Sequence, residues 1–298
     1  MKKQDSVILT GASGFIGSNI QCKHPIPRSI DLTDYPEVLA SFLHIGSADG
    51  IIHCAAKHGS NEQMRSLHST YVSNNLISDI NVLRAARASN IRNVLCISSI
   101  TAIPPSSKEV FTEDDLHFGQ LNSGIFGYSW SKKATVSICK SFQLENPTLN
   151  YKAVLLGNAY GPGCKFHDKA PVIANLIHQI GSAKRDGEKS VSLYGDGQDV
   201  RSFIYVKDLD RIFNDLLYDD SILDPIIISS METTSIRALA FLIAEEMQYK
   251  GDVLFSGNTS KNVQKTKVAK SNLIDINKYS LTSLKDGIRE TIRYYNNL

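Results

Sequence analysis

The sequence lacks the long apolar run that would place the chain in a membrane. None of its 298 residues belongs to a stretch that approaches the roughly 18 apolar residues of a membrane-spanning helix. The basic start at Met1 precedes a short apolar segment, but Gly11, Gly14 and Gly17 interrupt it, which argues against a secretory leader. We therefore expect a cytoplasmic protein without a membrane partner.

Paired cysteines and an excess of either charge are absent as well. The five cysteines form no CxxC pair and no metal-ligand spacing, so we expect neither a disulfide framework nor a metal site. The formal net charge of +2 gives no reason to expect a nucleic-acid partner. Hydrophobic residues make up 42% and charged residues 21% of the chain, which is the balance of an ordinary globular protein.

What the chain does contain is an alternation of short apolar strands with helix-like segments. Such an alternation implies crossover connections and a parallel sheet, and the near-continuous apolar character of the strands indicates that both faces are covered. The sequence therefore predicts an α/β fold with a doubly wound parallel sheet. The expected strands are 7–10, 50–54, 94–98, 152–156 and 225–229, and the clearest helices are 75–89 and 128–144.

The expected elements become shorter after residue 157. Glycine and proline pairs, such as those at 161–163 and 195–197, divide this part into shorter elements. We expect residues 1–157, together with a returning segment 203–229, to form the larger domain. Residues 158–202 and 230–298 are expected to form a smaller C-terminal α/β lobe that binds the substrate.

A glycine-rich loop, GASGFIG, lies directly between the first strand and the next helical segment. Glycines at 11, 14 and 17 allow a tight turn and a close approach of the backbone to a pyrophosphate, and a following helix would supply N–H donors. The position of this motif after a strand favours a dinucleotide-binding loop over a plain turn between core elements.

The segment that follows this loop is unusually short. Only thirteen residues separate Gly17 from Asp31, and Pro25 and Pro27 bar a long helix. We expect a helix no longer than 18–23 and a second strand that is short or absent. Arg28 could face the 2′-phosphate of NADP(H) or be a solvated surface arginine. Asp34, which precedes Pro36, is expected to cap the next helix.

A tyrosine, a lysine and a serine complete the pattern. Tyr128 and Lys132 are four residues apart, so they share one face of a helix. A phenol is a weak acid near neutral pH, and a nearby ammonium stabilises its phenolate form, which suits the group to proton transfer. Ser99 follows an apolar strand at the sheet edge where such folds bind ligands.

Together these motifs resemble the extended short-chain dehydrogenase/reductases, over nearly the whole chain. The carriers are GASGFIG, DLTD, HCAA, ISS, YSWSK and RSFIYVKD. The resemblance implies a Rossmann-type fold, bound NAD(P), and hydride transfer assisted by Ser99, Tyr128 and Lys132. We choose Ser99 over Ser98 because Ser99 lies five residues before Pro104, as the catalytic hydroxyl of that family precedes its Gly or Pro. The residues that the resemblance assigns to the cofactor are Gly11, Ser13, Gly14, Phe15, Ile16, Gly17, Arg28, Asp31, Leu32, Ala55, Ala56, Asn75, Tyr128 and Lys132.

Within that family the chain is most similar to the GDP-L-fucose synthases, through AAKHG, NAYGPGCKFHDKAPVIANLI and LYGDGQDVRSFIYVKDL. The similarity implies that Arg201 pairs with a nucleotide diphosphate, although a salt bridge to Asp199 or Asp208 would also explain this arginine. The other implied substrate-binding residues are Asn158, His167 and Val172.

Two positions depart from the fucose synthases. Those enzymes move protons at the epimerised carbons with a cysteine and a histidine. At the first position this chain has Thr101, and at the second it has Pro171 when a one-residue gap is allowed in the comparison. We expect Thr101 to assist Ser99, and His167 either to transfer protons or to be a plain loop residue.

The function expected from these residues is NAD(P)H-dependent reduction of a nucleotide-linked 4-keto-6-deoxy sugar without epimerisation, with a GDP-sugar and NADP(H) favoured. The alternatives are a nucleotide-sugar 4-epimerase with tightly bound NAD, and a non-catalytic NAD(P)-binding regulator. The resemblance also implies a homodimer, formed by the helices expected at 75–89 and 128–144.

Overall fold

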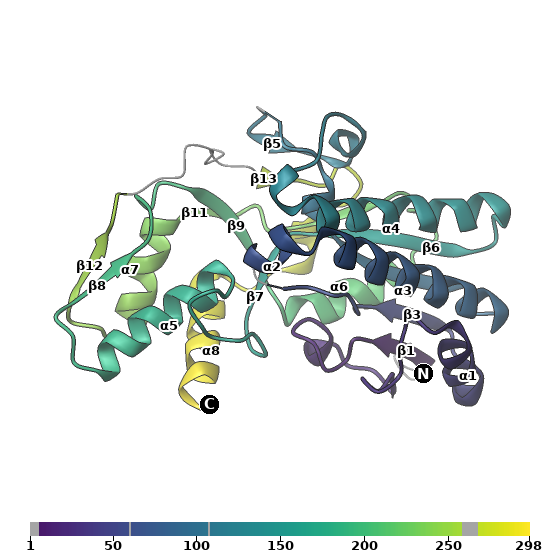
Figure 1. Ribbon diagram of the computed structural model, residues 1–298, viewed down its shortest axis with the longest axis horizontal. Coiled ribbons are helices and arrows are strands. Elements are labelled where there is room, and N and C mark those ends of the chain that lie inside the picture. Colours follow the sequence, from purple (N-terminus) through teal and green to yellow (C-terminus); the bar gives the residue numbers. More distant parts are fainter. Residues whose placement is uncertain (1–5, 60, 107, 258–267) are drawn as a thin grey trace.

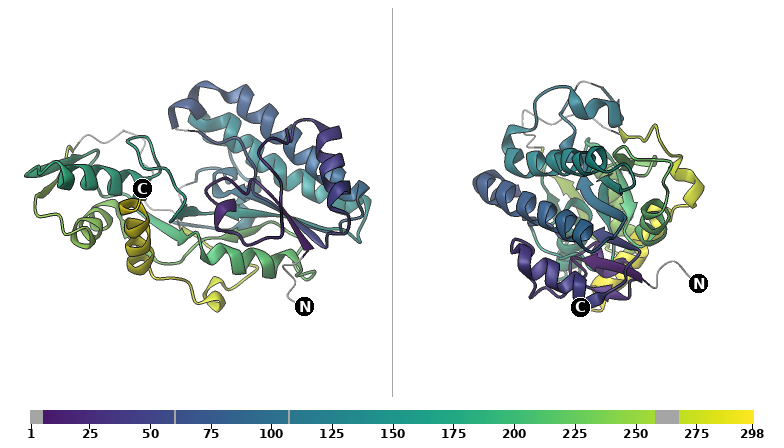
Figure 2. Two further views of the ribbon diagram at one scale, coloured as in Figure 1. Left: turned by 90° about the horizontal axis from the view of Figure 1, so that it is seen from below. Right: turned by 90° about the vertical axis from the view of Figure 1, so that its right-hand side faces the viewer.

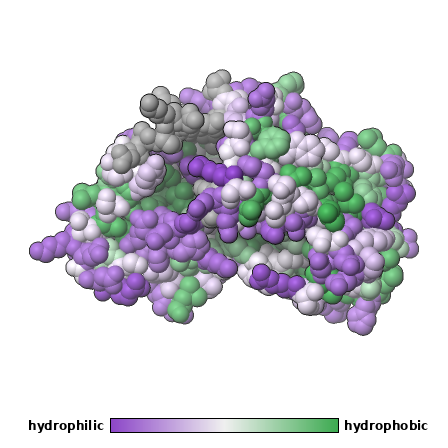
Figure 3. Space-filling model, in the orientation of Figure 1, coloured by the Kyte–Doolittle hydropathy of each residue, from purple (hydrophilic) through white to green (hydrophobic). Residues whose placement is uncertain are grey.

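The computed structural model describes residues 6–59, 61–106, 108–257 and 268–298. The first five residues, which include the basic start considered above as part of a secretory leader, lie outside the described ranges. The chain forms a larger α/β body and a smaller lobe beside it (Figure 1). In the space-filling view the surface is indented between the two (Figure 3). No helix in the described ranges is long and apolar enough to cross a membrane.

A parallel sheet of six strands forms the centre of the larger body, as the apolar runs predict. The order across the sheet is β10-β6-β4-β3-β1-β2, and every neighbouring pair is parallel. The strands are β1 (Val7–Thr10), β2 (His24–Pro25), β3 (Gly50–His53), β4 (Asn93–Ser99), β6 (Asn150–Leu156) and β10 (Ile226–Ile228).

Helices cover both faces of this sheet. Alternate strand residues, such as Ile8 and Ile51, pack with helices α1 (Tyr35–Ile45), α3 (His68–Ala88) and α4 (Phe126–Glu145). Their neighbours, such as Leu9 and Ile52, pack on the other side with α6 (Asp208–Leu217). Figure 2 shows the sheet between these two layers. The doubly wound, Rossmann-type architecture is therefore confirmed.

The first crossover is as short as the prolines indicate. In place of the helix expected at 18–23 the chain forms one 3-10 turn, Gly17–Asn19, and then enters the two-residue strand β2. The next helix begins where predicted, because the side chain of Asp34 accepts a hydrogen bond from the Glu37 backbone N–H at 3.1 Å.

Helix α3 begins seven residues earlier than its apolar spacing indicates. Its first turns are polar, so hydrophobic periodicity gives no signal there. Short elements frame this side of the body and leave little trace in the sequence pattern. They are α2 (Asn61–Ser66), β5 (Val110–Phe111) and 3-10 turns at Ile100–Ala102, Glu113–His117 and Ser123–Ile125.

The smaller lobe has its own apolar core, in which Ile177, Ile243 and Ile288 are buried. Its helices are α5 (Val172–Arg185), α7 (Ile236–Glu246) and α8 (Leu284–Asn296), and its two-stranded sheet joins β8 (Ser190–Leu193) to β12 (Asp252–Phe255). A three-stranded sheet links the lobe to the body through β7 (Asn158–Tyr160), β9 (Val200–Tyr205) and β11 (Thr233–Ser235).

The C-terminal part returns to the larger body before it ends in the lobe. Strand β13 (Val268–Ala269) pairs with β5, and Ile276 and Tyr279 of the following 3-10 turn pack on the core behind the sheet. The division at residues 157, 203 and 229 stays an expectation, and the segment 268–279 belongs spatially with the sheet.

Candidate active site

The glycine loop makes a tight turn against the end of β3. Gly11 has a φ of +71°, and a Cβ there would lie 2.6 Å from the backbone nitrogen of Ala55. A Cβ on Gly17 would lie 2.2 Å from the carbonyl oxygen of Gly11. Ser13 and Gly14 at the tip are exposed, whereas Phe15 and Ile16 pack on the core behind the sheet. The loop therefore presents backbone, unobstructed by side chains, at the carboxyl edge of the sheet, which fits a cofactor pyrophosphate.

The residues expected near the adenosine half of a cofactor lie close to this loop. Arg28 is exposed three residues after β2, and Asp31 begins the turn before α1. Hydrogen bonds from the backbone and side chain of Thr33 lower the pKa of Asp31. Leu32 packs against the α1/α3 core, and its carbonyl oxygen accepts a hydrogen bond from Asn81. Arg28 therefore offers an exposed guanidinium, and Asp31 an exposed carboxylate, in this region.

Asn75, another expected cofactor residue, is buried and fully engaged with protein. Its side-chain oxygen accepts from the Lys57 backbone N–H at 2.7 Å, and its amide donates to the Lys57 carbonyl and to Ser131 Oγ, each at 3.2 Å. It therefore fastens the segment after β3, which includes Ala55 and Ala56, to helix α4.

Helix α4 sets Tyr128 and Lys132 against the end of β4. Lys132 is 3% exposed, and its ammonium donates to the carbonyl oxygen of Ile97 at 2.9 Å. Tyr128 is also buried, and its ring packs with Met64 and Tyr71. A buried ammonium one turn from a phenol is the arrangement that proton transfer by the phenol requires.

The two serines at the end of β4 have different environments. Ser98 is buried and donates to the Lys132 carbonyl oxygen at 2.6 Å, so it secures α4 to the strand. Ser99 is half-buried, and its Oγ accepts hydrogen bonds from the Thr101 backbone N–H at 3.2 Å and from Thr101 Oγ1 at 3.1 Å. Of the two hydroxyls, only that of Ser99 remains available as a donor to a ligand.

One neighbour of Tyr128 escaped the sequence interpretation. The His58 ring meets the Tyr128 ring edge-on, with 5.2 Å between centroids. Desolvation in this setting lowers the pKa of His58, and the Lys132 ammonium lowers it further. The sequence places His58 in the loop after β3 and gives no signal of the distant residue that it contacts.

The expected substrate residues lie on the smaller lobe and its link to the body. The Asn158 amide donates to the Ser202 carbonyl oxygen at 3.0 Å. Arg201 lies 3.4 Å from a carboxylate oxygen of Asp199 and is partly exposed, while Asp208 instead accepts two hydrogen bonds from Thr282. Of the two carboxylates considered for Arg201, Asp199 is the one in contact.

The loop before α5 joins the lobe to the sheet edge. The Asn19 amide donates to the Pro162 carbonyl oxygen at 2.9 Å, and Lys169 forms an ion pair with Glu62 of helix α2. His167 is exposed on this loop, and its Nδ1 accepts from the Lys169 backbone N–H. Val172 is the first residue of α5, and Pro171 caps that helix. The loop thus lies beside the glycine loop, and within the described part of the chain no hydrogen bond joins His167 to Tyr128.

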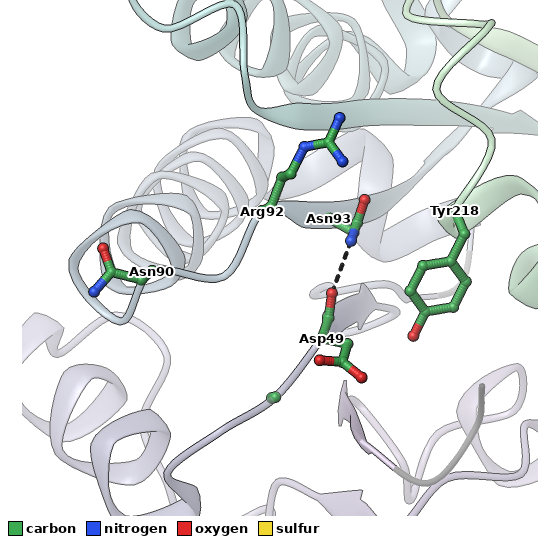
Figure 4. A pocket seen from close by; sticks show the side chains of 6 residues that line it. Asp49, Asn90, Arg92, Asn93 and Tyr218 are labelled. Atoms are coloured by element: carbon green, nitrogen blue, oxygen red, sulfur yellow. Dashed lines mark hydrogen bonds between the residues drawn. The ribbon is translucent and has the colours of Figure 1, made fainter. Parts of the chain in front are cut away.

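Other candidate sites do not compete with this one. A cavity of about 370 Å³ lies at the opposite, amino-terminal edge of the sheet, lined by Asp49, Asn93 and Tyr218 among others (Figure 4). Its arginine, Arg92, is engaged by Asp220 and the Thr148 carbonyl oxygen. No group of three or more His, Cys, Asp or Glu in the described ranges is placed to hold a metal ion.

Comparisons with known proteins agree with the resemblance. The chain is 26% identical over 302 residues to the GDP-L-colitose synthase of Yersinia pseudotuberculosis, covering 98% of each chain. It is 24% identical to the GDP-L-fucose synthase of Escherichia coli (strain K12), covering 99% of this chain and 97% of that one.

Solved structures share the fold. A GDP-L-fucose synthetase from Naegleria fowleri bound to NADP superposes with a TM-score of 0.87 at 19% identity, over 100% of this chain and 94% of that one. A GDP-mannoheptose C4 reductase from Campylobacter jejuni with NADP bound gives 0.84 at 21% identity, over 99% of each.

A family model described as the NAD dependent epimerase/dehydratase family matches residues 21–219. Because this match covers more than half of the chain, the protein belongs to that family, and with it to the extended short-chain dehydrogenase/reductases that its motifs resemble.

Proposed function

We propose that the protein is an NAD(P)H-dependent reductase of a nucleotide-linked 4-keto-6-deoxy sugar, with a GDP-sugar as the favoured substrate. The observation that carries the proposal is the Lys132 ammonium, which lies one helical turn from Tyr128 and is anchored to the strand that ends in Ser99. This arrangement lies at the same sheet edge as the glycine loop. The residues present therefore suit a nicotinamide dinucleotide and a carbonyl substrate together.

The cofactor, when bound, supplies a hydride to the carbonyl carbon. The protein's part is to hold and protonate the carbonyl oxygen. Ser99 donates its hydroxyl hydrogen to that oxygen, since Thr101 already donates to the Ser99 oxygen and orients it. Tyr128 then transfers its phenolic proton to the oxygen as negative charge develops, and the Lys132 ammonium stabilises the phenolate that remains. Hydrogen bonds hold the Ser99 hydroxyl and the Lys132 ammonium in place before the substrate arrives, so little reorganisation of these two groups is needed.

The substrate class is inferred from the relatives and from one arginine. The relatives reported above are named as synthases of GDP-L-colitose and GDP-L-fucose, and the similarity extends over nearly the full length of each. Arg201 is partly exposed and opposed by a single carboxylate at 3.4 Å, which leaves guanidinium donors for a diphosphate. Asn158, His167 and Val172 complete the proposed sugar site at the base of the smaller lobe.

We further propose NADP(H) as the cofactor. Two of the similar solved structures hold NADP, and Arg28 is an exposed cation just beyond β2. The other proposed cofactor residues are those of the glycine loop, the Asp31–Leu32 turn and Ala55–Ala56, with Asn75 as support beneath them.

The protein is proposed to act as a homodimer through α3 and α4. Ile77 and Ile80 on α3 and Phe126 and Trp130 on α4 are between 37% and 47% exposed, although both helices already bury another face against the sheet. A cavity of about 490 Å³ along α4 is lined by Phe126, Trp130 and Ala134 among others. Exposed apolar side chains on adjoining helices suit a self-complementary interface.

A ligand panel tests the substrate and cofactor together. Thermal unfolding is followed with GDP-, UDP-, dTDP- and CDP-sugars, each with NADP⁺ or NAD⁺, because a ligand that binds only the native state raises the unfolding temperature. The proposal expects the largest rise with a GDP-sugar and NADP⁺, followed by NADPH oxidation with the matching 4-keto sugar. Stabilisation by a different nucleotide, or co-purification of tightly held NAD⁺, would instead favour another substrate or the 4-epimerase alternative.

A further inference from the structure

Four buried polar side chains form a continuous hydrogen-bonded chain beneath the proposed site. His53 Nδ1 lies 2.6 Å from Thr10 Oγ1, and His53 Nε2 lies 3.0 Å from Asp79 Oδ1. Thr135 Oγ1 donates to Asp79 Oδ2 at 2.5 Å. Each of the four is at most 2% exposed. The chain runs from the last residue of β1, directly before the glycine loop, to helix α4, three residues beyond Lys132.

The donors in this chain can all point toward Asp79. With His53 protonated on Nε2 alone, its N–H donates to Asp79, and its Nδ1 accepts the hydroxyl hydrogen of Thr10. The Thr10 oxygen then accepts the Ala55 backbone N–H at 3.4 Å. Every polar group is satisfied without a second buried charge, which is the condition under which a buried carboxylate is tolerated.

Asp79 therefore carries a negative charge in the interior, close to Lys132. Burial alone would raise the pKa of Asp79, but the hydrogen bond from His53, the charge of the Lys132 ammonium and the Thr135 hydrogen bond together lower it. Lys132 is itself buried, and its ammonium donates to a neutral group, the carbonyl oxygen of Ile97. The carboxylate thus partly cancels the field of the ammonium.

The other titratable groups around Asp79 and Lys132 add no further negative charge. Burial raises the pKa of the Cys54 thiol to about 12, and it also contributes to raising the pKa of Cys96, after a hydrogen bond with Cys139. Both thiols therefore stay neutral near pH 7. The groups that face Asp79, Lys132 or Tyr128 are His53, Cys54, His58, Tyr71, Cys96 and Cys139.

We propose that Asp79 is a positioning residue for the reaction, holding α4 to the cofactor edge through His53 and Thr135 and tuning the acidity of the Tyr128 hydroxyl through Lys132. The inference rests on the proposed role of Tyr128 as proton donor. An ammonium favours the phenolate, and a nearby carboxylate weakens that effect. Asp79 thus limits how far Lys132 favours the phenolate before the reaction, while Lys132 still stabilises the negative charge that forms on Tyr128 in the transition state.

The test is a spectroscopic titration of Tyr128 with and without the Asp79 charge. The near-ultraviolet absorbance of phenolate is followed against pH in the wild type and in Tyr128→Phe, and the difference isolates Tyr128. The same pair of proteins is then prepared with Asp79→Asn, which can keep hydrogen bonds to its neighbours but carries no charge. We expect the Tyr128 midpoint to fall by about 0.5 to 1 pH unit, since the Lys132 field is then less compensated.

Two further variants separate tuning from support of the fold. Thr135→Val keeps the carboxylate and removes one hydrogen bond, so it is expected to leave the midpoint in place while lowering kcat by a few-fold. Asp79→Ser is a second way to remove the charge and is expected to shift the midpoint as Asp79→Asn does.

An unchanged midpoint in the folded charge-removing variants would overturn the inference. So would the failure of both Asp79 variants to fold, because Asp79 would then serve stability alone. The titration requires no sugar substrate. An error in the proposed function would therefore appear separately. The Tyr128 midpoint would still fall when the Asp79 charge is removed, but the wild-type protein would not reduce the 4-keto sugar.

Discussion

The ammonium of Lys132 donates to the carbonyl oxygen of Ile97 over 2.9 Å and is thereby held at the carboxyl end of β4. This bond joins the helix that carries Tyr128 to the strand that ends in Ser99. At the next residue of the strand, Ser98 donates back to the Lys132 carbonyl oxygen. The proposed catalytic groups are thus fixed by contacts that exist before any ligand binds, which limits the cost of ordering them.

Tyr128→Phe is expected to abolish most turnover and to leave cofactor binding nearly intact. The change removes only the hydroxyl, while the ring contacts with Tyr71 and His58 can persist. Loss of a general acid costs about 10²- to 10⁴-fold in kcat. The measurement is steady-state NADPH oxidation beside a cofactor titration. A variant with wild-type kcat would contradict the assignment of Tyr128 as proton donor.

The sequence predicted a parallel sheet, the alternation of its strands with helices, and a shared helix face for Tyr128 and Lys132. These features could be predicted because they depend on local patterns. Apolar runs and glycines signal strands and tight turns within a few residues. The bond between His53 and Asp79 joins residues 26 positions apart, and no periodicity announces such a pair. The contact of His58 with Tyr128 was missed for the same reason, since it exists only once β3 and α4 lie together.

Arg28→Ala is expected to reduce the preference for NADPH over NADH. An exposed guanidinium that meets a 2′-phosphate contributes a charge-assisted hydrogen bond worth about 1.5 to 3 kcal/mol, or about tenfold or more in kcat/KM for NADPH. The value for NADH should change little. Lys23→Ala, at another exposed cation of the same short crossover, is the matched control. A wild type that already prefers NADH would refute the role given to Arg28.

His58 is expected to make stability fall in mildly acidic solution. Desolvation and then Lys132 lower its pKa in the folded protein, whereas the unfolded chain titrates near about 6.5. Between these two values the unfolded state binds more protons, so stability rises with pH and is lost as the pH drops through this window. Because the His58 side chain is itself exposed at the surface, solvent screens part of this effect, and thermal unfolding of His58→Gln should show only a slightly weaker dependence there than the wild type. His117→Gln replaces another exposed histidine, on a turn away from Tyr128 and Lys132, and should keep the wild-type slope. Equal slopes in all three proteins would contradict an effect specific to His58.

Trp130→Glu is expected to convert the proposed homodimer into monomers. The indole is 44% exposed on α4, and a charge buried in an apolar interface is costly. Light scattering at micromolar concentration measures the mass. Leu43→Glu places the same charge at an exposed leucine of α1, outside the proposed interface, and should leave the mass unchanged. A wild type that is monomeric under these conditions would remove the basis of the proposal.

The enzyme is expected to reduce its substrate without epimerising it. Epimerisation beside a keto group requires one group to remove a carbon-bound proton and another to return a proton on the opposite face. At the two positions where the fucose synthases carry a cysteine and a histidine, this chain has Thr101, whose hydroxyl is bonded to Ser99, and Pro171, which caps α5. Neither side chain titrates near pH 7.

Turnover in deuterated water tests this expectation directly. Hydride delivery and protonation of the carbonyl oxygen leave carbons 3 and 5 untouched, so the product should carry no solvent deuterium there beyond the background exchange of the keto substrate. Thr101→Cys is the informative companion, because a thiolate could restore exchange at one of these carbons while Ser99, Tyr128 and Lys132 stay in place. Mass spectrometry of the product locates the label. Enzyme-dependent deuterium in the wild-type product, or inversion at either carbon, would show that this chain supplies its own proton-transfer groups. His167 on the loop before α5 and His58 beside Tyr128 would then be the residues to replace first, since each places an imidazole near the proposed sugar site.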